Sequence, residues 1–153
     1  MASITNLENF DSDQHFTPSA VFEKLNLTFD LDVAAYHSQN HVPVKAIYCK
    51  CCHDGLEENW FGLVWMNPPY SKPTPWVEKF LAHANGIALL PITRGRWWDS
   101  IWQSEGLIVP SAYNFKFERP DGVKRDITFR TMLFAVGQIA TTALQQSGLG
   151  RVR

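Results

Sequence analysis

The chain has 153 residues, of which 45% are hydrophobic and 19% charged, and its formal net charge is -1 at pH 7. This composition excludes a disordered chain and indicates one globular domain, with no room for a second specificity domain of any size. The chain has no apolar run of roughly 18 residues and no basic region followed by an apolar core at its N-terminus, so we expect no membrane span, no secretory signal and a cytoplasmic protein.

Three segments are expected from the pattern along the chain. Residues 1–12 show little periodicity and are expected to form a flexible leader. The globular domain should cover residues 13–137, and residues 138–153 should be a tail of weak helical character. Near the start of the domain, Thr17-Pro18 fits an N-cap followed by a proline in the first helical turn. Such a helix start with a hydroxyl also suits an anion, although a plain N-cap explains it equally well.

Two strands are expected next, at residues 29–35 and 44–49. Asp32 lies in the carboxyl half of the first strand, where open α/β sheets bind their ligands. Asp54-Gly55 follows the second strand. Its carboxylate can accept a hydrogen bond from a ligand amine, and the glycine permits close approach, but Asp-Gly is also a common turn pair.

Three cysteines and a histidine lie close together at Cys49, Cys51, Cys52 and His53. A structural zinc site usually needs a second pair of ligands some distance away, and adjacent cysteines are awkward ligands for one metal ion. We therefore expect reduced thiols and no metal, while the sequence alone leaves metal binding open.

The most informative motif is Asn67-Pro68-Pro69-Tyr70, which directly follows the apolar run 61–66. Two prolines end a strand and expose carbonyl oxygens without a strand partner. The Asn67 side chain and the Pro68 carbonyl can accept both hydrogens of a flat amine, and Tyr70 offers a ring for stacking. This arrangement favours methyl transfer from S-adenosylmethionine to a planar nitrogen. The alternative is a rigid turn between a strand and a helix.

Beyond the motif, residues 71–75 form a polar, proline-rich loop, and residues 74–81 have the spacing of a helix. The apolar run 87–92 indicates a central parallel strand. Residues 115–118 and 128–136 are expected to form a C-terminal antiparallel hairpin that closes the sheet.

Basic residues are concentrated in the second half of the chain, although any single one is more simply a solvated surface charge. The hairpin is the best candidate for a DNA-facing element. The candidate DNA contacts are Lys72, Arg94, Arg96, Arg119, Lys124 and Arg125.

The motifs resemble those of a known family, the small phage-type DNA N-6-adenine-methyltransferases related to Dam. The resemblance covers about residues 13–137. It rests on Thr17-Pro18, the run 29–35, Asn40, Asp54-Gly55-Leu56, Trp60 and the run 64–70. The Gly-x-Gly common in S-adenosylmethionine sites is replaced here by Val33-Ala34-Ala35, as is typical of this small subfamily.

The resemblance implies a three-layer, Rossmann-like S-adenosylmethionine methyltransferase fold with a mostly parallel sheet. It implies a double-stranded DNA substrate, a flipped adenine, S-adenosylmethionine as cofactor and Asn67 to Tyr70 as the catalytic motif. The cofactor would be bound by Thr17, Pro18, Asp32, Asn40 and Asp54. Two alternatives stay open: methylation of another planar nitrogen, in an RNA base or a protein glutamine, and a catalytically silent DNA-binding module. The oligomeric state and the recognised bases are not predicted.

Overall fold

The computed structural model describes residues 17–35, 42–93, 95–110, 116–118, 124–126 and 130–150, with only the main chain described at 116–118 and 124–126. The elements are α2 (Ser19–Leu25), β1 (Phe29–Ala35), β2 (Val44–Cys49), β3 (Val64–Met66), α3 (Thr74–His83), β4 (Gly86–Pro91), α4 (Arg96–Gln103), β5 (Leu107–Pro110), β6 (Lys116–Glu118), β7 (Lys124–Asp126), β8 (Thr131–Val136) and α5 (Gln138–Gln146). Across these ranges, no helix has the length and apolar character of a membrane span.

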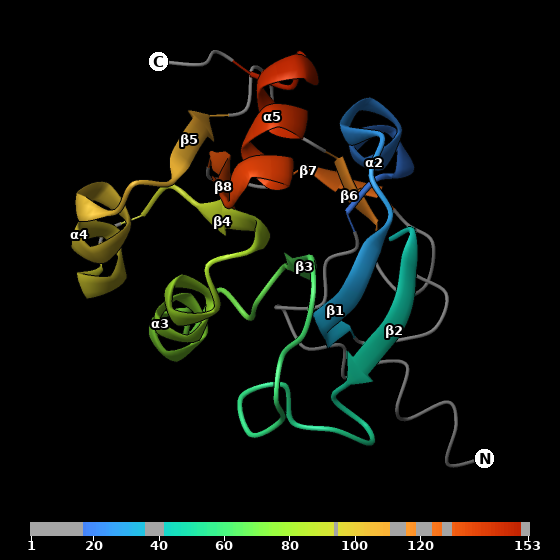
Figure 1. Ribbon diagram of the computed structural model, residues 1–153, viewed down its shortest axis with the longest axis vertical. Helices are drawn as coiled ribbons and strands as arrows, with labels where there is room; N and C mark the ends of the chain where they lie inside the picture. Colours follow the sequence, from blue (N-terminus) through green and yellow to red (C-terminus); the bar gives the residue numbers. More distant parts are fainter. Residues whose placement is uncertain are drawn as a thin grey trace.

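Six strands form one mixed sheet in the order β2-β1-β3-β4-β8-β5, and β6 and β7 form a separate antiparallel pair (Figure 1). The pairs β1-β2, β1-β3 and β3-β4 are parallel, whereas β8 is antiparallel to both β4 and β5. The strand order therefore reverses at β1, with β2 on one side and β3 on the other. In open α/β sheets a reversal of this kind creates a ligand crevice at the carboxyl ends of the strands.

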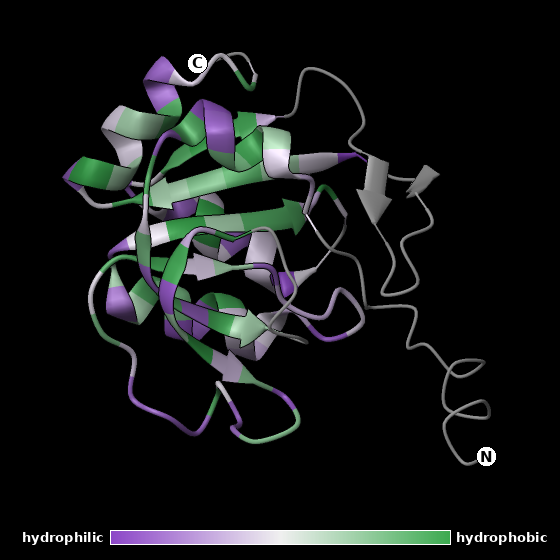
Figure 2. Cartoon of the chain, turned by 90° about the vertical axis from the view of Figure 1, so that its right-hand side faces the viewer, coloured by the Kyte–Doolittle hydropathy of each residue, from purple (hydrophilic) through white to green (hydrophobic). Residues whose placement is uncertain are grey.

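The sheet is the middle of three layers, with α2 and α5 on one face and α3 and α4 on the other (Figure 1). Alternate residues of the central strand β4 enter the two cores: Ile87 and Leu89 face α2 and α5, whereas Ala88 and Leu90 face α3 and α4. Both faces are thus covered, which explains why the strands in Figure 2 are hydrophobic along most of their length.

The local patterns predicted the N-terminal half of the sheet correctly. The strands expected at 29–35 and 44–49 are confirmed with those bounds. The helix expected at 74–81 is confirmed as α3, which buries Val77 and Phe80 at helical spacing. The strand expected at 87–92 is present one residue earlier, as β4.

Two expectations were wrong in detail, and the weak helical character expected at 138–153 is present as a full helix. The strand at 116–118 pairs with 124–126 and not with 128–136. The strand β8 instead pairs with β4 on one side and β5 on the other. The tail contains helix α5, whose Ala140 and Leu144 are buried in the core. Thr17 is not the N-cap of α2: Pro18 occupies that position, without a side-chain cap.

Candidate functional site

The predicted catalytic motif lies at the point where the strand order reverses. Asp32 of β1 is in register with Trp65 of β3, and the chain leaves β3 one residue after Trp65, at Met66. Asn67 therefore begins at the carboxyl edge of the sheet, beside the end of β1. The prolines of the motif end the strand, as the sequence predicted.

Asn67 is half-buried and contacts the N-terminal segment. Its Nδ2 donates a long hydrogen bond of 3.5 Å to Oγ1 of Thr17, a residue only 5% exposed. The bond joins two predicted site residues that are fifty positions apart, and it holds the donor end of the Asn67 amide toward Thr17. The Thr17 hydroxyl acts here as an acceptor for Asn67 and not as a helix cap.

Tyr70 is held in place through its hydroxyl. The Oη atom donates a 3.1 Å hydrogen bond to the main-chain carbonyl of Leu89. The pairing of β3 with β4 ends at Met66 and Ala88. The Tyr70 hydroxyl therefore donates to a carbonyl of β4 that lies beyond the end of β3. Burial of the hydroxyl raises the pKa of Tyr70 above its ordinary value. The phenol therefore stays protonated as a donor.

The two aspartates of β1 have different roles. Asp32 is 2% exposed, and its Oδ1 accepts a 3.2 Å hydrogen bond from the main-chain N–H of Ala34. Asp30 instead accepts a 2.8 Å hydrogen bond from the N–H of Leu63 and pairs with Lys45 at 3.4 Å. The Leu63 N–H lowers the pKa of Asp30, partly opposed by burial and supported by Lys45. Asp30 is thus part of the framework, whereas Asp32 is buried within β1, three residues before the end of the strand.

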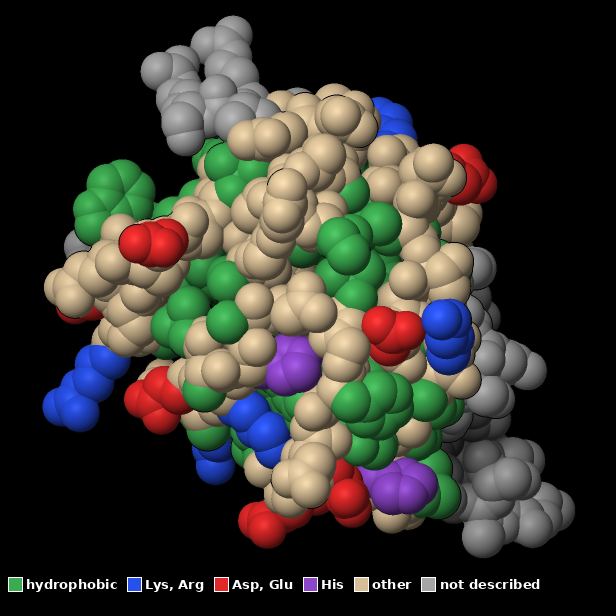
Figure 3. Space-filling view, in the orientation of Figure 1, with side chains coloured by type: hydrophobic (Ala, Val, Ile, Leu, Met, Phe, Trp, Pro, Cys, Tyr) green, Lys and Arg blue, Asp and Glu red, His purple; other side chains and the backbone are tan. Residues whose placement is uncertain are grey.

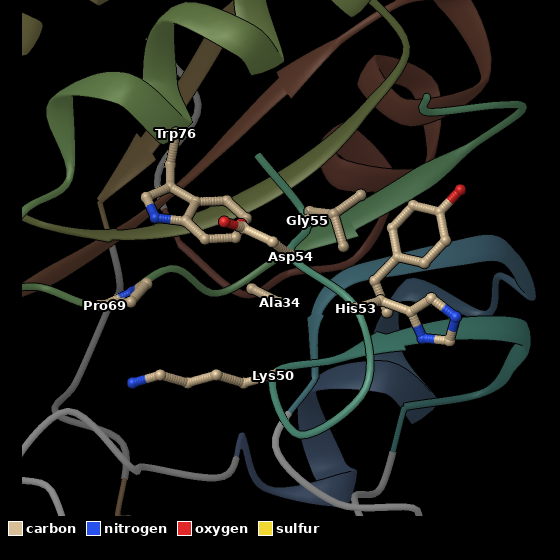
Figure 4. Close-up of a pocket in the computed structure, with 9 residues that line it drawn as sticks. Ala34, Lys50, His53, Asp54, Gly55, Pro69 and Trp76 are labelled. Carbon is tan, nitrogen blue, oxygen red and sulfur yellow. The ribbon is translucent and has the colours of Figure 1, made fainter. Parts of the chain in front are cut away.

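A cavity of about 210 Å³ opens beside the end of β1 (Figure 4). In Figure 4 the Trp76 ring extends from α3 toward Asp54, and Lys50 crosses the lower part of the view. Pro69 lies on the left of the view, across from His53 on the right. Asp54 and Pro69 are predicted site residues that the structure brings to one cavity. Its full lining is Val33, Ala34, Tyr48, Lys50, His53, Asp54, Gly55, Pro69 and Trp76.

Sequence reasoning assigned no site role to four residues of this lining, Tyr48, Lys50, His53 and Trp76. Lys50 and His53 follow the end of β2, where Ala35 of β1 is in register with Cys49. The rule that singled out Asp32, a polar residue at the carboxyl end of a parallel strand, could have found both. Trp76 carried no such signal, since its place in α3 resembles that of a core residue.

Gly55 closes one wall of the cavity. A Cβ atom at this position would meet the Val33 carbonyl at 2.0 Å and the Trp76 ring at 2.9 Å. Only a glycine permits this contact between the loop, β1 and α3. Next to it, Oδ1 of Asp54 accepts a 2.9 Å hydrogen bond from the N–H of Leu56. The Asp54 carboxylate is therefore oriented by its own turn.

The cysteine cluster lies beside the cavity. Cys49 is buried, Cys51 and Cys52 are exposed, and these three, all within the range 42–93, form no disulfide. The Sγ atoms of Cys49 and Cys51 are 2.8 Å apart. Burial is the largest cause that raises the pKa of Cys49, and the side-chain contact with Cys51 is the second. Among the residues with described positions, no three His, Cys, Asp or Glu side chains could together hold a metal ion.

The remaining predicted residues are less well placed by the structure. Pro18 is half-buried at the start of α2, and Lys72 and Arg96 are exposed. Asn40, Arg94 and Arg119 lie outside the described residues, and Lys124 and Arg125 belong to β7, where only the main chain is described. On the face seen in Figure 3, positive and negative side chains are interspersed and do not form one basic patch.

The three layers, the strand reversal and the cavity beside β1 define the class: an α/β protein with a ligand crevice at the carboxyl edge of its sheet. Residues 4–106 match the family described as DNA N-6-adenine-methyltransferase (Dam), and the chain belongs to that family. The resemblance inferred from the motifs is thereby confirmed.

A similar protein is the DNA N-6-adenine-methyltransferase of Haemophilus phage HP1 (strain HP1c1), which is 31% identical over 110 residues. The aligned part covers 65% of this chain and 62% of that protein, so the chain spans less than two thirds of this relative's length. No solved structure matches the chain.

Proposed function

We propose that the protein is an adenine-specific DNA methyltransferase that transfers a methyl group from S-adenosylmethionine to the exocyclic N6 of an adenine flipped out of the duplex. The observation that carries the proposal is the position of Asn67-Pro68-Pro69-Tyr70 directly after β3, at the reversal of strand order and two residues beyond Trp65, the register partner of Asp32. The family to which the chain belongs and the name of its phage relative support the same activity.

The residues of the motif would act on the adenine amine through hydrogen bonds. Thr17 accepts from the Nδ2 end of the Asn67 amide, and the Oδ1 end would be the acceptor for one amine hydrogen. The Pro68 carbonyl, two residues after the end of β3, would accept the other. Two accepted hydrogen bonds stabilise positive charge as it develops on the nitrogen, so no separate base of tuned pKa is needed at the start. The Tyr70 ring would stack on the base.

The residues around the crevice fit the cofactor. S-adenosylmethionine, when bound, supplies an electrophilic methyl group. The carboxylates of Asp32 and Asp54 suit its hydroxyl and amino groups, because ionised carboxylates accept charge-assisted hydrogen bonds. The mostly apolar cavity wall, including Val33 and Trp76, suits a flat ring. Thr17, Pro18 and Asn40 complete the proposed cofactor set.

The β6-β7 pair is a suitable DNA-facing element because of where its connection leaves and rejoins the sheet. Pro110 at the end of β5 is in register with Met132, and Thr131 at the start of β8 is in register with Pro91 at the end of β4. Both ends of the connection are therefore at the carboxyl edge that carries Asn67. Duplex DNA bound there would need to flip a base to reach the crevice, at a cost of a few kcal/mol.

The proposal is tested by incubating the protein with duplex DNA and labelled S-adenosylmethionine, followed by digestion to nucleosides. The expected product is N6-methyldeoxyadenosine, and Asn67→Ala should lower turnover by orders of magnitude at nearly unchanged cofactor affinity. Retention of more than about a tenth of the wild-type rate would refute the role of Asn67.

The same labelling assay with RNA and protein as further substrates, together with direct measurements of DNA binding and cofactor binding, decides between the proposal and its alternatives. Label in RNA or in protein glutamine, with none in DNA, would reassign the substrate. DNA binding with no binding of the cofactor would indicate a catalytically silent module.

A further inference from the structure

Lys79 of α3 is half-buried, and its ammonium group donates hydrogen bonds only to main-chain carbonyls of the loop 55–58 among the contacts described. Nζ donates to the main-chain carbonyls of Gly55 at 3.2 Å, Leu56 at 2.8 Å and Glu58 at 2.5 Å. A lysine ammonium has three N–H donors and no acceptor, so these three carbonyls account for all of its donors. The ammonium also lies 5.3 Å from the centre of the Trp60 ring, within the range of a cation–π interaction.

Two further side chains fix the same loop, Trp60 from within the loop and His83 from α3. Nε1 of Trp60 donates a 2.7 Å hydrogen bond to the Gly55 carbonyl, the same oxygen that Lys79 contacts. His83 contacts the Gly62 carbonyl through Nε2 at 2.7 Å, and its ring packs edge-on against Trp60 at 5.9 Å. Lys79 and His83 are four residues apart and lie on one face of α3.

The fixed carbonyl determines the orientation of Asp54. The peptide unit between Gly55 and Leu56 directs its C=O to Lys79 and Trp60, and its N–H to Oδ1 of Asp54. A rotation of that peptide would withdraw the N–H from the carboxylate. Asp54 and Gly55 both line the cavity beside β1, whereas Lys79 does not. Lys79 is thus connected to the cavity through one peptide unit.

We propose that Lys79 is a positioning residue: with Trp60, it fixes the Gly55-Leu56 peptide so that Asp54 is oriented toward the bound cofactor. The inference rests on the proposed function, because Asp54 is assigned to cofactor binding there. It predicts that an ammonium outside the cavity controls cofactor affinity without touching the reacting atoms.

The test compares Lys79→Met with the wild type and with Lys24→Met, a matched loss of charge on the exposed side of α2. Binding of S-adenosylhomocysteine is measured by calorimetry, and hydrogen exchange of the Leu56, Glu57 and Glu58 amides is measured without ligand. We expect Lys79→Met to raise the dissociation constant about tenfold or more, to speed exchange at these amides and to keep kcat within about threefold at saturating cofactor. Lys24→Met should match the wild type in every measurement.

Wild-type affinity in a folded Lys79→Met protein would overturn the inference. Slower turnover at saturating cofactor with unchanged affinity would do the same. If Lys79→Met does not fold, Trp60→Phe replaces it, since this change removes the indole donor and keeps a ring. A folded Trp60→Phe protein with wild-type affinity and wild-type exchange would also overturn the inference. Failure of the wild type to bind S-adenosylhomocysteine would instead refute the proposed function.

Discussion

Tyr70 combines a structural hydroxyl with a proposed stacking ring, and Tyr70→Phe separates the two. The phenylalanine keeps the ring but removes the hydroxyl that donates to the Leu89 carbonyl at 3.1 Å. A neutral hydrogen bond is worth about 1 kcal/mol net, and an unsatisfied buried acceptor costs about 1–3 kcal/mol. We therefore expect a loss of about 2 kcal/mol of unfolding free energy. For a chain of this size, that corresponds to a fall of roughly 4–8 °C in Tm.

Catalysis should respond differently from stability. Below its melting transition, Tyr70→Phe should keep kcat within about threefold of the wild type, because the ring that stacks on the base is unchanged. Tyr70→Ala, the matched variant without a ring, should lose at least about tenfold in kcat/KM. The assays are thermal denaturation followed by circular dichroism, and methyl transfer to duplex DNA at a temperature where all three proteins are folded.

The pH dependence gives an independent check. A tyrosine in the unfolded chain ionises near pH 10, whereas burial raises the pKa of Tyr70 in the folded protein. The stability due to its protonated hydroxyl is thus fully present below about pH 10 and declines as the pH rises above that value. The difference in Tm between wild type and Tyr70→Phe should narrow above pH 10. A Tm difference that stays constant above pH 10 would refute the structural role of the hydroxyl. A folded but inactive Tyr70→Phe protein would refute the proposal that the ring alone serves catalysis.

Two further predictions concern the ligands. Asp54→Asn keeps an oxygen for the Leu56 N–H but removes the negative charge. The cofactor dissociation constant should therefore rise by the equivalent of roughly 1.5–3 kcal/mol, as measured by calorimetry. Equal affinity in the variant and the wild type would show that Asp54 does not bind the cofactor. Replacing Lys124 and Arg125 of β7 with Ala should weaken DNA binding on all sequences and flatten the salt dependence of log K by about one to two units. If both quantities stay at wild-type values, Arg96 at the start of α4, with its neighbour Arg94, becomes the leading candidate.

Local patterns predicted the part of the site that depends on strand ends. The prolines after Met66 show where β3 stops, and the aspartate in β1 shows which residue lies at the same edge. Both signals are local, because proline geometry and the alternation of a strand depend on near neighbours. These signals predicted Asp32 and Asn67, whose strands are paired in the structure, but the cavity beside β1 is lined by Asp54 and not by Asp32 or Asn67.

Long-range contacts explain what the sequence did not predict. Thr17 has the pattern of an N-cap, but its hydroxyl binds Asn67, fifty residues away. β5 has only four residues and no alternation, and it joins the sheet through β8. Lys79 resembles any solvated lysine on a helix, and only the fold brings three carbonyls around its ammonium. No local pattern contains these pairings.

The place of β8 between β4 and β5 has a consequence for biosynthesis. The ribosome releases β4 and β5 well before Thr131–Val136, the strand that pairs with both. During that interval the growing chain presents unpaired backbone edges, which can associate with other nascent chains. Recovery of folded protein should therefore depend on how long this interval lasts, which is set by the release of residues 111–130.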